Sequence, residues 1–222
     1  MLPLVSSAHV SSPEAKAAVR DFHRLYYDEI GSVWDTTFWL GTSVLKCPFD
    51  LWLYQELIHQ TRPDLIIETG TFRGGSALFM ASVCQLIGSG RVITIELRDR
   101  GEMPQHDLIT YIRGSSVAPE VVAEVRGLIG EDETVMVTLD SKHSRDHVLE
   151  ELHTWAPFVT KDQFLIVEDT NINGNPVRPG WGPGPKEALE AFLAESDEFV
   201  VEPDCDRFLL TFNPGGYLRR RA

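Results

Sequence analysis

Short apolar runs alternate with longer segments of helical periodicity along most of this chain. Runs of four to six residues rich in Val, Ile, Leu and Phe are typical of strands buried on both faces of a sheet. Strands that alternate with helices predict a mostly parallel sheet with helices on both faces, which is an α/β fold. We expect seven strands, at 65–68, 92–96, 109–112, 135–140, 164–169, 199–201 and 208–212.

The segments between the strands carry apolar residues at helical spacing. Proline and glycine mark several of their ends, as expected where helices begin and stop. We see no internal repeat and no low-complexity linker, so we expect one domain. Within it, residues 1–44 form an N-terminal helical cap segment, and 45–222 form the α/β domain. We expect helices at 14–30, 50–60, 76–80 and beyond, 119–128, 144–155 and 186–194.

The cap segment ends in an irregular stretch, 32–48, that contains Trp34, Phe38 and Trp39. Three interpretations remain open for this stretch. It covers an active site, it mediates self-association, or it packs on the domain without a further role.

Charge and composition narrow the range of partners. The chain has 222 residues, a net charge of −13 and 43% hydrophobic residues, which suits one globular domain. Its acidity argues against nucleic acid or an anionic membrane as a partner. The three cysteines, Cys47, Cys84 and Cys205, lack metal-like spacing and indicate reduced thiols. The stretch 1–10 does not resemble a signal peptide, and no apolar run is long enough for a membrane span, so we expect a cytoplasmic protein.

A glycine turn follows the first strand. Glu68, Gly70 and Gly74 form an acid-x-Gly-x-x-x-Gly pattern that opens a helix. A dinucleotide fingerprint would need glycine at position 72, which is Phe72. Glycine lets a backbone approach a ligand closely, next to the N–H groups of a helix start. The spacing resembles the S-adenosylmethionine (SAM) loop of Rossmann-like methyltransferases, in which an acid faces the charged side of the cofactor.

Carboxylates stand at the ends of four of the expected strands. Ligands of open α/β sheets bind at the carboxyl ends of the strands, so this edge is the candidate site. Glu96 is suited to accept both hydroxyls of a ribose, or it is a solvated acid beside Arg98 and Arg100. Ser115, in the turn after the third strand, is placed for the edge of an adenine or belongs to an ordinary turn.

Three acids at adjacent strand ends form a sharper cluster. Asp140, Glu168 and Asp169 would lie within a few ångströms of one another, where bare carboxylates repel. Mg²⁺ removes that conflict and leaves coordination positions for water and substrate. Bound there, it would lower the pKa of a substrate hydroxyl. The alternative is three unrelated acids: one on the surface, one at a helix cap and one hydrogen-bonded in the core.

A catalytic base is expected next to these acids. His143 lies three residues beyond Asp140 and titrates in the range that suits a general base. His147, one helical turn further on, and Lys142 are the other candidates. A structural or solvated role is the alternative for both histidines.

The Pro- and Gly-rich segment 171–185 is too long for a bare connector. It is either a binding loop, in which Trp181 packs on a substrate ring, or a cover for a sheet edge or subunit contact.

In these residues and their spacing, the chain resembles the cephalosporin hydroxylase (CmcI-like) family. That family includes SAM- and Mg²⁺-dependent O-methyltransferases of antibiotics, macrolides and rhamnosyl-bearing natural products. Phe72-Arg73 and Cys47 depart from the family pattern. The matching stretches are 62–70, 74–77, 139–141, 143–144, 167–171, 182–185 and 213–218.

The resemblance implies a Rossmann-like class I methyltransferase fold. It places the metal on Asp140, Glu168 and Asp169, and it makes the acceptor a hydroxyl of a small natural product. It places SAM around Glu68, Gly70, Ser76, Glu96 and Ser115, and we expect Thr71 and Asp140 to be further cofactor contacts. We also expect Asp140 and His143 to be the catalytic residues and the protein to form a homo-oligomer.

Two rival functions remain at this point. A hydroxylase or other oxidoreductase of antibiotic biosynthesis would need a nicotinamide fingerprint or a two-His-one-carboxylate iron site. A non-catalytic accessory subunit would keep the fold and support another enzyme.

Overall fold

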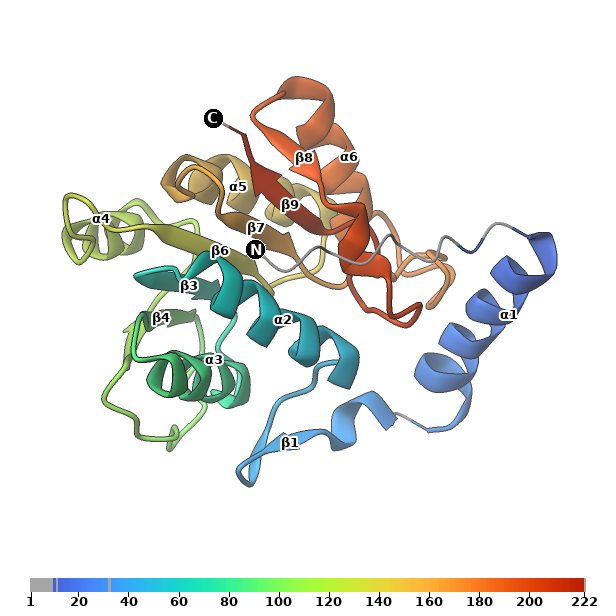
Figure 1. The fold of residues 1–222 in the computed structure, drawn as a ribbon, viewed down its shortest axis with the longest axis horizontal. Coiled ribbons are helices and arrows are strands. Elements are labelled where there is room, and N and C mark those ends of the chain that lie inside the picture. Colours follow the sequence, from blue (N-terminus) through green and yellow to red (C-terminus); the bar gives the residue numbers. More distant parts are fainter. Residues whose placement is uncertain (1–9, 11, 32, 222) are drawn as a thin grey trace.

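The computed structural model describes residues 10, 12–31 and 33–221, and its centre is a seven-stranded sheet with the order β5-β4-β3-β6-β7-β9-β8 (Figure 1). β3 pairs in parallel with β4 and β6, β4 with β5, and β6 with β7. β9 is antiparallel to both of its neighbours. The predicted mostly parallel seven-stranded sheet is therefore confirmed. The strands are β3 (Leu65–Thr69), β4 (Arg91–Glu96), β5 (Ile109–Arg113), β6 (Val135–Leu139), β7 (Phe164–Val167), β8 (Phe199–Val201) and β9 (Tyr217–Arg220).

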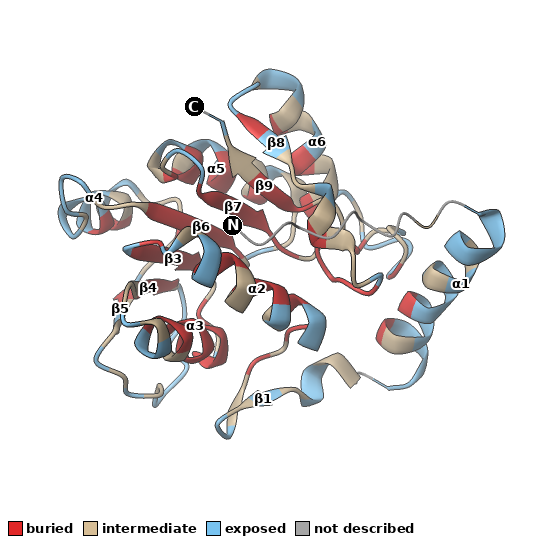
Figure 2. Ribbon diagram, viewed as in Figure 1, coloured by how far each residue is buried: buried red, intermediate tan, exposed pale blue. Residues whose placement is uncertain are grey.

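Helices cover both faces of this sheet, and the central strands are buried throughout (Figures 1 and 2). Successive side chains of a strand point to opposite faces. Leu65 and Ile67 therefore join the cluster under α4 (Pro119–Gly127), α5 (Arg145–Trp155) and α6 (Pro185–Glu195). Ile66, between them, joins the cluster under α2 (Pro48–Thr61) and α3 (Gly75–Ile87). This two-sided burial explains why the strands are apolar runs without alternation.

The N-terminal segment is more ordered than the sequence predicts. α1 (Pro13–Arg24) continues into a π-helical turn, η1 (Leu25–Glu29), instead of one helix to residue 30. The stretch expected to be irregular contains a short helix, η2 (Val33–Thr36), and a hairpin of β1 (Phe38–Trp39) and β2 (Thr42–Ser43). Tyr27, the second of two tyrosines in η1, stacks on Trp34 and meets Phe212 edge-on, at ring-centroid distances of 5.4 and 5.0 Å.

The prediction of a strand at 208–212 is wrong. Leu209 has φ of +69°, which breaks an extended run. The N–H of Phe212 donates to the buried carboxylate of Asp50 at 2.8 Å, so it is satisfied without a neighbouring strand. The last strand is β9, which fills the position between β7 and β8.

The structure tests few of the remaining predictions that rest on composition. Cys47, Cys84 and Cys205 are all buried and free of disulfides. Among the described residues, no helix has both the length and the apolar character needed to span a bilayer. The stretch judged not to be a signal peptide lies outside the described residues apart from Val10. The division of the chain at residue 44 stays a prediction.

The glycine turn brings two strand ends into direct backbone contact. A Cβ on Gly70 would lie 1.9 Å from the carbonyl oxygen of Asp140, after β6. A Cβ on Gly75 would lie 2.1 Å from the carbonyl oxygen of Ser43, the last residue of β2. These glycines therefore allow the protein's own chain to approach, in addition to any ligand.

We expect Gly70→Ala to destabilise the fold far more than a positive φ alone would. Gly70 and Gly180 have nearly the same φ, +89° and +87°, but nothing lies within 4 Å of a Cβ on Gly180. Gly180→Ala should cost about 1–2 kcal/mol of backbone strain. Gly70→Ala should cost about 4 kcal/mol or more, because backbone atoms must also move. Urea denaturation of both variants tests this, and equal losses would contradict it.

Candidate active site

A cavity of about 540 Å³ opens at the carboxyl edge of the parallel strands. This volume is in the range of small-molecule sites. Glu96, at the end of β4, and Ser115, after β5, line one side of it, and Asp169, after β7, lines the other. Asp140, after the central strand β6, lies between them. We call the β4–β5 side the glycine-turn end and the opposite side the aromatic end.

At the glycine-turn end, Glu96 lines the cavity and organises the loops around it. Its Oε2 accepts from the N–H of Phe72 and its Oε1 from the N–H of Arg98, both at 2.9 Å. A carboxylate has further lone pairs, so Glu96 retains capacity for a ribose. Gly70, Thr71, Ser76 and Ser115 also line this cavity. Their predicted contacts with a cofactor stay predictions.

The unusual Phe72-Arg73 pair has a structural explanation. Phe72 adopts a left-handed conformation with φ of +50°. The guanidinium carbons of Arg100 and Arg73 lie 5.0 and 5.6 Å from the centroid of its ring. Cation–π attraction of this kind holds the ring at the mouth of the turn.

Glu68 is placed differently from the expectation that it faces a ligand. It is fully buried and is not among the described residues that line the cavity. Its carboxylate accepts hydrogen bonds from Ser76 and, at 2.6 Å, from Thr94. Burial raises the pKa of Glu68 to about 7. In this structure the residue ties the start of α3 to β4 from behind the cavity wall.

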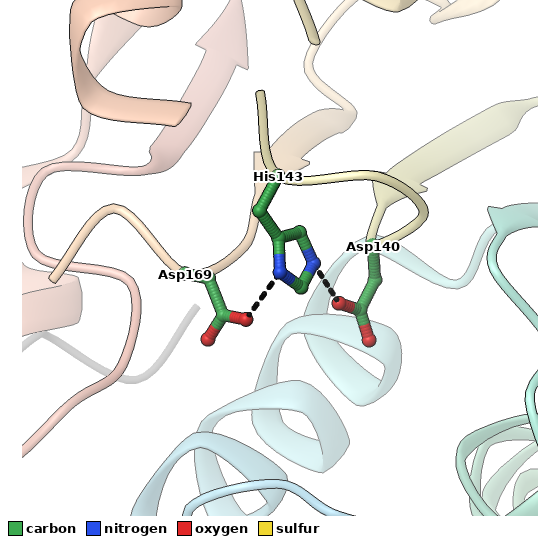
Figure 3. Close-up of side chains that lie close together, drawn as sticks. All are labelled: Asp140, His143 and Asp169. Atoms are coloured by element: carbon green, nitrogen blue, oxygen red, sulfur yellow. Dashed lines mark hydrogen bonds and ion pairs between the residues drawn. The ribbon is translucent and has the colours of Figure 1, made fainter. Parts of the chain in front are cut away.

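His143, in the wall of the cavity, lies between two carboxylates (Figure 3). Its Nε2 is 3.2 Å from Oδ1 of Asp140, and its Nδ1 is 3.1 Å from Oδ2 of Asp169. The acids follow the adjacent strands β6 and β7, and the loop after β6 carries the histidine back between them. Asp140 and His143, predicted as the catalytic pair, are thus brought together.

The charges around His143 dominate its protonation. Burial by itself would lower the pKa of the imidazole, but Asp169, Asp140 and Glu168 outweigh burial and raise the pKa to about 9. Burial also works against ionisation of Asp140, yet Lys46 and His143 hold its pKa below the ordinary value. Asp140 is therefore held as a carboxylate between two cations, Lys46 and His143.

Glu168, the third predicted metal ligand, is not in the group formed by Asp140, His143 and Asp169. Its Oε1 accepts from Lys46 at 2.5 Å, Tyr54 at 2.6 Å and Thr138 at 3.0 Å. Burial, followed by the charge of Asp140, raises the pKa of Glu168 to about 8. A metal role for Glu168 stays a prediction.

Lys46 is the residue that sequence reasoning missed. Its side chain is 3% exposed, and its Nζ also lies 2.8 Å from Oδ2 of Asp140. The only signal in the sequence is one cation in the otherwise apolar stretch between Val44 and Cys47. Burial acts to lower its pKa, but the nearby acids raise it above the usual value.

The residues present fit a hard divalent cation. One ligand atom from each of Asp140, His143 and Asp169 lies within 4.8 Å of the other two. Mg²⁺ is commonly held by one or two carboxylates, with water or substrate in the remaining positions. Asp140 and Asp169 supply that number of carboxylates at the cavity wall.

The other two candidate bases lie outside this cluster. Nε2 of His147 is 3.0 Å from Oγ of Ser141, which in turn donates to the buried Glu151 at 2.7 Å. Lys142 lines the cavity but is exposed. Only His143 among the three predicted bases touches both aspartates.

Aromatic side chains line the aromatic end of the cavity. Tyr27, Trp34 and Phe212 come from the N-terminal segment and the chain before β9. Arg178 and Trp181 come from the loop between β7 and α6. Trp181 is 53% exposed, and its indole N–H donates to the carbonyl of His143 at 3.2 Å. The long Pro- and Gly-rich loop is therefore a wall of the cavity.

Comparison with known proteins identifies the family. Residues 31–221 match the family model for rhamnosyl O-methyltransferase/CmcI. The rhamnosyl O-methyltransferase of Mycobacterium leprae is 37% identical over 210 residues, which cover 90% of each chain. The protein of the same name from Mycobacterium tuberculosis is 36% identical over 214 residues, covering 92% of this chain and 85% of the relative.

Solved structures agree in fold. A CmcI structure named for Mg and SAM has a TM-score of 0.67 at 20% identity, covering 86% of this chain and 79% of its own. The O-methyltransferase TomG from Streptomyces achromogenes has a TM-score of 0.52 at 16% identity, covering 97% and 93%. Both similarities support the fold alone. It is the predicted Rossmann-like class I methyltransferase fold. The family model and the mycobacterial relatives together show that this chain belongs to the rhamnosyl O-methyltransferase/CmcI family.

Proposed function

We propose that this protein transfers a methyl group from SAM to a hydroxyl oxygen of a sugar-bearing or polyketide-type natural product, with help from Mg²⁺. Membership in the family makes the chain an O-methyltransferase. The observation that carries the finer proposal is His143, held between Asp140 and Asp169 in the wall of one cavity. This position lies between a glycine turn suited to a nucleoside and an aromatic end suited to an acceptor.

The glycine-turn end is the proposed SAM site. SAM would supply an electrophilic methyl group there. Glu96 offers carboxylate oxygens for the ribose, and Ser115 offers a hydroxyl beside the adenine. Because the backbone of Gly70 packs against that of Asp140, a nucleoside bound at this turn would lie close to the end of β6. A CmcI structure with the same fold is named for Mg and SAM, which supports this assignment.

Asp140 and Asp169 are the proposed metal ligands. Mg²⁺ held by them would polarise an acceptor hydroxyl and lower its pKa. The two carboxylates approach from neighbouring strand ends, so they present oxygens to one point in the cavity. An acceptor oxygen held there would lie beside His143.

His143 is the proposed general base. Bare Asp140 and Asp169 raise the pKa of His143 to about 9, so the imidazole would act as a base once a metal ion neutralises these carboxylates. In that neutral form, the imidazole accepts the hydroxyl proton on one ring nitrogen while the other donates to an aspartate. That second contact fixes the orientation of the ring. Alignment of the deprotonated oxygen behind the methyl group supplies a proximity effect.

The aromatic end is the proposed acceptor site. The mycobacterial relatives are named rhamnosyl O-methyltransferases, so a deoxysugar ring is the acceptor we favour. The exposed ring of Trp181 lies in the wall beside His143 and offers a flat apolar surface to such a sugar. The same surface suits the aglycone of a glycoside.

The donor set disfavours the oxidoreductase alternative. A non-haem iron oxygenase uses two histidines and one carboxylate. The cluster here has one histidine and two carboxylates. Turnover by the isolated chain separates the enzyme from an accessory subunit.

Replacement of His143 should abolish catalysis without abolishing SAM binding. We expect His143→Ala to lower kcat about 100-fold to 10,000-fold, the usual contribution of a general base. SAM affinity, measured by calorimetry, should change less than threefold by our estimate, because the residue lies outside the glycine-turn end. Methyl transfer to a nitrophenyl rhamnoside provides the activity assay. The control is His153→Ala, which removes a half-exposed histidine from α5. Full activity of His143→Ala would eliminate the base role.

Trp181 should contribute to acceptor binding. We expect Trp181→Ala to raise the KM for the rhamnoside about tenfold, because it removes a stacking surface of aromatic size. Trp181→Phe keeps a ring but loses the hydrogen bond to His143, so its effect should fall mainly on kcat. Trp52→Ala, at a similarly exposed tryptophan on α2, is the control. An unchanged KM for Trp181→Ala would contradict the assignment of the aromatic end.

A further inference from the structure

Lys46 is a buried cation that the proposed reaction does not use. It lies between β2 and α2, in a stretch whose geometry is strongly constrained. The preceding Leu45 has φ of +58°, and the carbonyl of Ser43 rests against Gly75. These constraints direct the lysine to the carboxyl ends of the central strands.

The ammonium of Lys46 joins two of the acids predicted to bind metal. Nζ lies 2.8 Å from Oδ2 of Asp140 and 2.5 Å from Oε1 of Glu168. These acids follow β6 and β7, which pair in parallel. The lysine therefore relieves the repulsion between two neighbouring carboxylates that would otherwise need an added cation.

Lys46 also divides the two oxygens of Asp140 between different partners. Oδ2 faces the ammonium, and Oδ1 faces His143 at 3.2 Å. Asp140 can present Oδ1 to the cavity because Oδ2 is anchored from behind. Removal of the ammonium would free the carboxylate to rotate and would take one of its three hydrogen-bond donors from the buried Glu168.

We propose that Lys46 is a positioning residue that serves as a built-in cation, which keeps the acid cluster assembled without a divalent ion and weakens divalent binding at Asp140 and Asp169. This inference rests on the metal site of the proposed function. A fixed positive charge repels a divalent cation that shares a carboxylate with it. Even at the dielectric constant of water, a single and a double charge about 6 Å apart repel enough to change affinity about tenfold.

The test compares wild-type protein with Lys46→Met, which keeps the length of the side chain without its charge. We expect Mg²⁺, titrated as its chloride in a calorimeter, to bind Lys46→Met about tenfold more tightly. In EDTA, the Tm of this variant should fall by about 10 °C, as expected when a buried ion pair loses one partner. Added Mg²⁺ should recover most of that loss. A purely structural lysine would lower the Tm without tightening Mg²⁺ binding.

Two further variants keep the test decisive. Lys161→Met removes an exposed lysine and controls for the change in net charge. If Lys46→Met does not fold in EDTA, the double variant with Glu168→Gln removes both members of the pair and should regain stability.

The outcomes separate this inference from the proposed function. Equal or weaker Mg²⁺ binding by Lys46→Met, with measurable binding by wild type, overturns the inference. An unchanged Tm of Lys46→Met in EDTA also overturns the inference. If neither wild type nor any variant binds Mg²⁺, the proposed metal site is wrong. The proposed effect of Lys46 on Mg²⁺ affinity is then wrong too. The EDTA melting curves then still decide whether the lysine holds the acids together.

Discussion

The concentration of negative charge at the ends of β6 and β7 is the constraint on which this active site depends. Asp140, Glu168 and Asp169 follow two strands that are hydrogen-bonded in parallel, so the topology forces them together. Within the described part of the chain, two cationic side chains from different segments lie against these acids. His143 lies between the aspartates, and Lys46 lies between Asp140 and Glu168. The contacts with Lys46 and His143 offset the repulsion that would otherwise separate the two strand ends.

The sides of the cavity differ in how closely they are tied to the sheet. The glycine-turn end is built from strand ends and a turn in which the backbone of Gly70 touches that of Asp140, so its shape follows from the fold. The aromatic end is built from the N-terminal segment and a long loop. Loops tolerate change better than packed strand ends do. A family can therefore keep one methyl-donor site and vary its acceptors.

The element order and the edge that carries the site were predictable, because buried strands leave apolar runs and parallel topology aligns their carboxyl ends. The strand expected at 208–212 fails because the carboxylate of Asp50, far away in the sequence, captures the N–H of Phe212. Glu68 was assigned to the correct edge, but it is enclosed by Ser76 and Thr94. No local pattern carries that information.

By itself, the sequence determined the α/β architecture, the family and the set of acids that gather at one edge. Periodicity, glycine spacing and strand-end residues are local features, and local sterics and burial are enough to interpret them. Only the tertiary structure decided how those acids are paired. Lys46 and Glu168 are 122 positions apart, and the choice between a lysine, a histidine or a metal as counter-charge depends on which side chains the fold brings within about 3 Å. Charge pairing is a matter of distance in space, which the order of residues does not record.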